Sequence, residues 1–147
     1  MRKLSDFYVS KSVMLKLVAV SGVLGLGHHI AHIIRGNHVG WPVVPEVTAF
    51  TYSLFIYPLI LVGLYFEYRD RDTSVYWPLV LFPIFALVAV THFGPWALEP
   101  PSHVIEPYSS FYIGVLAFVW LLALTVSLAF TLIQSITVFL ERKQFSE

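Results

Sequence analysis

Four long stretches of the chain are almost entirely apolar, and short polar segments separate them. These runs lie near residues 12–34, 49–67, 76–96 and 109–140. A helix needs about 20 apolar residues to cross the hydrocarbon core of a bilayer, and each run is close to that length or longer. The pattern therefore predicts four transmembrane helices.

The composition agrees with this prediction. The chain is 57% hydrophobic and 12% charged, whereas an average soluble domain is roughly 45–50% apolar and about 25% charged. No internal repeat and no second domain is evident. We therefore expect an all-α integral membrane protein in which residues 1–147 form a single domain surrounded by the lipid bilayer.

The first run has one alternative interpretation, a cleavable signal peptide. Residues 1–16 are basic and residues 17–27 are apolar, as in such peptides. However, the basic region is long, and the apolar part continues through Ile30, Ile33 and Ile34. We expect the run to remain as a membrane span.

The distribution of charge predicts the orientation of the four spans. They place both termini and the 68–75 loop on one side, and the 35–48 and 97–108 loops on the other. The first side carries most of the basic residues, namely Arg2, Lys3, Lys11, Lys16, Arg69, Arg71, Arg142 and Lys143. Because basic residues favour the cytoplasmic side, we expect an antiparallel four-helix bundle in the cell membrane with both termini cytoplasmic.

Proline and small polar residues predict details inside the spans. Pro58 and Pro83 should bend their helices or leave backbone carbonyls unpaired. The fourth run exceeds the thickness of the hydrocarbon core, so its helix must tilt or continue into the cytoplasm. On this helix we expect four side chains to form interhelical hydrogen bonds: Thr131, Gln134, Ser135 and Thr137.

The histidines carry the main clue to function. All six, His28, His29, His32, His38, His92 and His103, fall at or beyond the outer ends of the first and third spans. Ionisable groups at membrane depth are costly and usually functional. In a compact bundle the first and third helices can face one another, which would bring His92 opposite His28, His29 and His32.

Small residues precede this cluster. Gly22 and Gly25 lie one or two helical turns before the histidines on the same face of the first helix. Such a bare surface fits a flat macrocycle standing against the helix, and it equally fits close packing of two helices.

Two cofactors suit this pattern. In the first interpretation, His92 and one of His28, His29 and His32 are the axial ligands of haem b, and Arg35, the lone cation of the outer side, pairs with the haem propionates. In the second, these histidines chelate a copper, iron or zinc ion. The chain has no cysteine, which excludes thiolate sites, iron–sulfur clusters and covalent c-type haem.

Several residues have plainer interpretations. His38 and His103 fit solvent-exposed or loop-ordering roles better than ligation. Glu46, Glu99 and Glu106 are explained as solvated loop charges or as partners of Arg35. Arg35 itself can snorkel to the interface. The formal net charge of zero and the lack of a basic block give no reason to expect nucleic acid.

The architecture resembles that of small four-helix b-type membrane cytochromes, which carry histidines on separate helices near the outer face. The leading hypothesis is a membrane redox subunit that binds haem b and transfers electrons between a quinone pool and a partner protein within a larger complex. The alternatives are a metal-dependent oxidoreductase or metal-handling subunit, and a structural accessory subunit whose histidines only form hydrogen bonds.

Overall fold

The computed structural model describes residues 4–39 and 44–146, and all regular elements in these ranges are α-helices. Four helical segments are long and apolar enough to cross a membrane: Phe7–Gly36, Ala49–Tyr68, Tyr76–Phe93 and Phe111–Gln144. The helices themselves are α1 (Leu4–Val39), α2 (Ala49–Ser53), α3 (Ile56–Tyr68), α4 (Tyr76–Phe93), α5 (Pro101–Ile105) and α6 (Phe111–Ser146). The prediction of an all-α protein with four candidate spans is confirmed.

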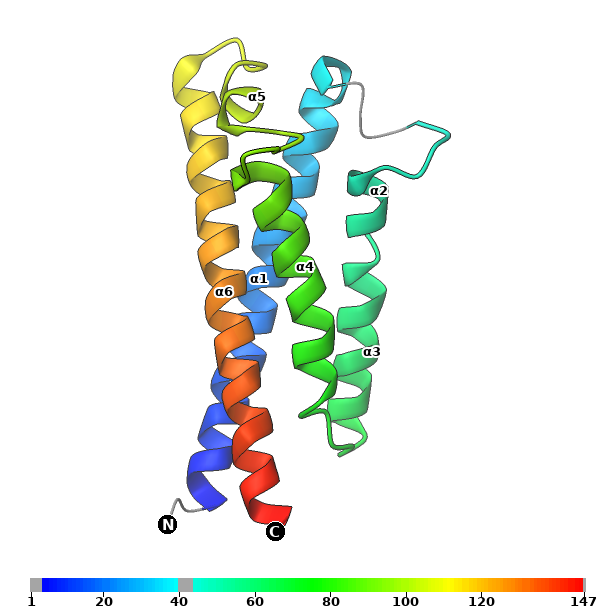
Figure 1. Cartoon of the computed structure of the whole chain (residues 1–147), viewed down its shortest axis with the longest axis vertical. Helices are drawn as coiled ribbons and strands as arrows, with labels where there is room; N and C mark the ends of the chain where they lie inside the picture. The colour runs from blue at the N-terminus through cyan, green and yellow to red at the C-terminus, as the bar shows by residue number, and fades with distance from the viewer. Residues whose placement is uncertain (1–3, 40–43, 147) are drawn as a thin grey trace.

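The two longest helices, α1 and α6, pack along one another, and α4 packs against α6 and α3 (Figure 1). Both ends of the chain lie at the same end of the molecule, and the connection between α3 and α4 lies toward that end (Figure 1). The short helices α2 and α5 lie toward the opposite end (Figure 1). This arrangement gathers the ends of α1 and α4 that carry the histidines.

The ends of the helices do not coincide with the ends of the apolar runs. The third run, 76–96, is longer than α4, because Gly94 after Phe93 takes an extended conformation (φ −78°, ψ 163°) and Pro95 follows it. The first run, 12–34, is shorter than α1, because the helix continues through polar residues that lie outside the apolar pattern. Hydropathy therefore locates the spans but not the ends of their helices.

Proline interrupts the second span. The helix breaks at Leu54 and Phe55, between α2 and α3. Pro58 has no N–H to donate to the carbonyl of Leu54, and its ring crowds that carbonyl. The N–H of Tyr57 bonds to the Leu54 carbonyl instead, at 3.2 Å. Pro83, in contrast, lies inside α4, which continues through it.

Most apolar side chains face outward. In each span only 17% to 28% of the residues in the most apolar segment are buried within the chain, so the remaining apolar surface suits a lipid environment. The buried core consists of Met14, Val18, Trp77, Leu81, Leu124, Leu128 and Val138. It joins α1, α4 and α6 beneath the histidines.

Hydrogen bonds also join α1 to α6. The hydroxyl of Ser21 lies 2.8 Å from that of Ser127 and 2.9 Å from that of Thr131. Gln134 donates to the carbonyl of Ser10 at 3.1 Å. The expected interhelical bonds of Thr131 and Gln134 are confirmed. Thr131 also donates to the carbonyl of Ser127 in its own helix. For Ser135 and Thr137 the expectation is wrong, because among the described residues their hydroxyls bond only within α6, to the carbonyls of Leu132 and Ile133.

Ion pairs and hydrogen bonds hold the loop between α3 and α4 against the neighbouring helices. Glu67 pairs with Lys11 at 2.6 Å and accepts a hydrogen bond from Trp77 Nε1 at 3.2 Å. In the loop, partial burial raises the pKa of Asp72, but hydrogen bonds from Arg142 and Ser74 outweigh burial and hold that pKa below its ordinary value. This end of the molecule is thus held by ionic contacts between α1, α3, α6 and the loop.

Two glycines give a test of the packing of α3 against α4. A Cβ on Gly63 would lie 2.6 Å from the rings of Tyr76 and Trp77, and Trp77 is fully buried. We expect Gly63→Ala to lower the free energy of unfolding by about 1–3 kcal/mol through overpacking. Gly22→Ala is the matched control, because its Cβ would meet only Ile60 Cδ1 at 3.8 Å. It should be neutral or stabilise by up to about 1 kcal/mol.

Denaturant unfolding in detergent micelles measures both changes. Equal stabilities for Gly63→Ala and Gly22→Ala would contradict the packing described for α3 against α4.

Candidate metal centre

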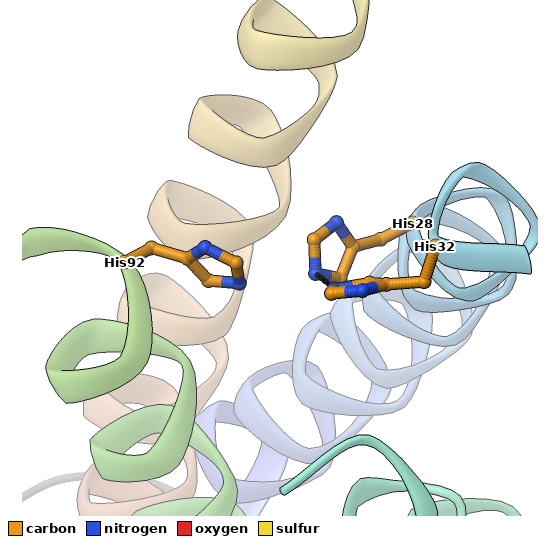
Figure 2. Close-up of side chains that lie close together, drawn as sticks. All are labelled: His28, His32 and His92. Carbon is orange, nitrogen blue, oxygen red and sulfur yellow. Dashed lines mark hydrogen bonds between the residues drawn. The ribbon is translucent and has the colours of Figure 1, made fainter. Parts of the chain in front are cut away.

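Three buried histidines from two spans converge on one point. His28 and His32 project from α1 toward His92, which projects from the last turn of α4 (Figure 2). One ring nitrogen of each lies within 4.8 Å of the other two. The residues are 6%, 4% and 2% exposed. Such a cluster can hold a metal ion.

The two histidines of α1 converge because they are four residues apart and therefore share one helix face. Their Nε2 atoms are 3.0 Å apart and share a hydrogen bond, so the proton of that bond must leave before both nitrogens can bind one ion. Two nitrogens bound to one tetrahedral zinc ion at about 2.0–2.1 Å lie about 3.3 Å apart. This pair is therefore already spaced as a chelate, and His92 needs to move closer by at most about 1.5 Å to join it.

The chain after α4 orients His92. The segment following Gly94 turns back, so that the N–H of Glu99 donates to the carbonyl of Thr91 at 3.0 Å. The carbonyl of Glu99 in turn lies 2.9 Å from His92 Nδ1. A carbonyl can only accept, so Nδ1 carries the proton and Nε2 keeps its lone pair. Histidine ligands of metals are commonly oriented by such a bond.

Glu99 also brings a negative charge to the cluster. One of its carboxylate oxygens, Oε2, lies 3.4 Å from His32 Nε2 and 3.9 Å from His92 Nδ1. The glutamate is 1% exposed. A carboxylate next to the imidazoles makes the site favourable for a cation, and it can act as a partner of the ligands.

Arg35 balances this charge from the other side. Its Nη2 lies 3.4 Å from Glu99 Oε2, and its Nη1 donates to the carbonyl of His103 at 2.9 Å. Both side chains of the pair are 1% exposed. The alternative in which Arg35 snorkels to the interface is therefore wrong, as is that in which Glu99 is a solvated charge. The pairing of the two is confirmed, and it commits Arg35 to a protein partner.

His29 points elsewhere. One residue along the helix, it faces α2 and α3, where its Nε2 lies 2.7 Å from the hydroxyl of Ser53 and its Nδ1 lies 2.6 Å from that of Tyr57. Ser53 donates its own proton to the carbonyl of Phe50. His29 Nε2 therefore donates to Ser53, and Nδ1 accepts from Tyr57. Both nitrogens of His29 are occupied, which leaves His28, His32 and His92 as the converging set.

A cavity of about 60 Å³ lies beside the three histidines. Most of its polar lining, including Ser53, Tyr57 and Thr91, lies near the histidines, and Ser21 lies deeper. Its other walls are mostly aliphatic side chains of α1, α3, α4 and α6. Gly22 and Gly25 are also part of the lining. Added Cβ atoms would come no closer than 3.8 Å to Ile60 and Tyr57. These glycines therefore border free space rather than a tight helix contact.

Gly27 shows the contrast. A Cβ there would lie 2.6 Å from the ring of Trp120, whose Nε1 donates to the carbonyl of Leu24. Close packing of α1 against α6 thus requires Gly27. The sequence alone did not distinguish this role from that of Gly22 and Gly25.

Sequence reasoning also missed several residues of the site. It left Glu99 among three equivalent loop carboxylates, and it did not select Tyr57 or Ser53 as partners of His29. The available signal for Glu99 was the presence of a single outer cation, Arg35, which needs a partner if buried. Of the two loop histidines, His103 contributes its carbonyl, and the side chain of His38 lies outside the described residues.

No protein-family model matches this chain, and no similar curated protein or solved structure was found.

The buried pair of Arg35 and Glu99 yields a prediction about stability. Removing one partner leaves an uncompensated buried charge, so Arg35→Ala and Glu99→Ala should each lower the free energy of unfolding by about 3–5 kcal/mol. The double variant Arg35→Met with Glu99→Leu removes both charges and should recover most of that loss. Thermal unfolding in detergent micelles measures all three changes.

Arg71→Ala is the control, because Arg71 is exposed in the loop between α3 and α4. Its effect should stay within about 0.5 kcal/mol. If Arg35→Ala costs no more than Arg71→Ala, the ion pair does not stabilise the site.

Proposed function

We propose that this chain is a membrane-embedded metalloprotein that binds one transition-metal ion through His28, His32 and His92. The observation that carries the proposal is the convergence of three buried imidazoles within 4.8 Å, one of them with its ligating nitrogen selected by the Glu99 carbonyl. Packing alone gives no reason to bury three such rings at membrane depth.

The donor set favours copper, iron or zinc, since imidazole suits these ions and the chain has no thiolate to offer. Three protein ligands leave a fourth tetrahedral position open, which is the pattern of catalytic rather than structural sites. All three histidines line the cavity, so that open position is reachable by a small ligand. We therefore propose a metal-dependent oxidoreductase, or the metal-binding subunit of one.

The orientation belongs to the same proposal. In an antiparallel four-span bundle, the excess of basic residues at the ends and in the 68–75 loop favours a cytoplasmic location for both termini. The metal centre then lies near the outer, periplasmic face of the cell membrane. Partner subunits of a larger complex stay a prediction.

Haem b also stays a prediction, but the geometry favours an ion. Axial ligation would place the macrocycle between His92 and one histidine of α1. Instead the His92 ring lies against both His28 and His32, with ring centroids 5.0 Å and 5.9 Å away, as suits three ligands of one ion. The neighbouring cavity of about 60 Å³ is far smaller than a porphyrin. Arg35, the expected propionate partner, is paired with Glu99.

Metal analysis of the purified protein tests the proposal. The wild-type chain should retain close to one equivalent of copper, iron or zinc after dialysis, without the Soret band of haem. Single changes His28→Ala, His32→Ala and His92→Ala should each weaken binding by about 100-fold or more, because each removes a ligand.

His29→Gln and His103→Gln are matched controls, since the first histidine is bound to Ser53 and Tyr57 and the second contributes its main-chain carbonyl. They should retain the metal. Retention by the variant lacking all three converging histidines would refute the site. A Soret and α-band shift between oxidised and reduced protein would instead establish haem.

A further inference from the structure

The cavity beside the histidines has a chemistry of its own. Most polar groups of its lining gather at the histidine end, and the remaining walls are mostly aliphatic, including Val18, Ile60, Leu81, Val88 and Leu128. The deeper part also has Ser21, whose hydroxyl is bonded to those of Ser127 and Thr131. Apolar cavities of this kind stay dry and take up apolar molecules. Water is therefore a poor occupant of the deeper part.

The size of the cavity limits the occupant. An apolar cavity of about 150 Å³ in another protein holds benzene or xenon, whereas this one measures about 60 Å³. A quinone ring is larger than this volume, and so is the acyl chain of a lipid. A molecule of two heavy atoms fits.

The sequence keeps this space open. Side chains at Gly22 and Gly25 would project toward it, and an added Cβ at either position would meet no atom closer than 3.8 Å. Neighbouring helices therefore do not require glycine at these two positions, in contrast to Gly27 and Gly63. Because Gly22 and Gly25 have no side chains, the cavity next to the open coordination position stays free.

We propose that this cavity is the binding site for a small apolar diatomic molecule, with dioxygen as the substrate, which reaches the metal from the bilayer. The inference rests on the proposed metal site for its chemistry. Apolar solutes prefer hydrocarbon to water, so the bilayer is a reservoir of dioxygen around the spans. In the simplest reaction, a Cu(I) ion held by the three histidines would give one electron to dioxygen, which would leave Cu(II) and superoxide without transfer of a proton. Turnover would require a one-electron donor to return the copper to Cu(I).

Xenon tests the cavity independently of the metal. It is an apolar atom that enters dry cavities, and the chemical shift of xenon-129 in the metal-free protein reports its binding. The wild-type chain should bind xenon. Val88→Phe, which fills the cavity from α4, should weaken binding by roughly tenfold or more. Val90→Phe, the same change at a position that is 65% exposed on the same helix, should leave binding unchanged.

Oxidation of the copper-loaded protein tests the route to the metal. Val88→Phe should slow the oxidation of Cu(I) by dioxygen roughly tenfold, and Val90→Phe should not. Neither change should alter oxidation by ferricyanide, a water-soluble anion that does not enter an apolar cavity. If Val88→Phe also slows the oxidation of Cu(I) by ferricyanide, the substitution has disturbed the metal site itself. That result counts against the proposed route.

Two results would overturn the inference: no xenon binding by the wild-type chain, or equal rates with dioxygen for Val88→Phe and Val90→Phe. A chain that binds xenon but no copper would support the small-molecule site and refute the metal site instead. The two failures are therefore distinguishable.

Discussion

A polar group within a bilayer needs a partner, because hydrocarbon offers none and each unsatisfied group costs several kcal/mol. This constraint organises the half of the molecule that carries the histidines. Arg35 reaches Glu99 and a main-chain carbonyl, and His29 reaches Ser53 and Tyr57. Contacts between these buried polar side chains thus tie the helices together.

These contacts also orient the residues of the candidate metal centre. Glu99 uses its backbone to select the tautomer of His92 and its side chain to place a negative charge beside His32. Arg35 holds that carboxylate from the far side. Ligands oriented in this way lose little freedom when an ion binds. In the proposed function, the aliphatic walls of the neighbouring cavity select which molecules reach the ion.

Much of the fold follows from the sequence, because a bilayer demands long apolar runs whatever the tertiary contacts. The end of α4 was misplaced, since Gly94 and Pro95 continue the apolar pattern while they end the helix. The partners within the site depend on long-range packing. A rotation of α1 by 100° exchanges His28 for His29, and hydropathy does not encode it. Nor does spacing show that Glu99, among three loop glutamates, folds back into the bundle.

X-ray absorption at the edge of the bound metal tests the central claim most directly. The account predicts nitrogen or oxygen neighbours at about 2.0–2.1 Å, with the outer-shell scattering of three imidazoles. That scattering should fall to two imidazoles in His92→Ala and remain at three in His29→Gln. A metal surrounded by oxygen ligands without imidazole, or a spectrum unchanged by His92→Ala, would contradict the account.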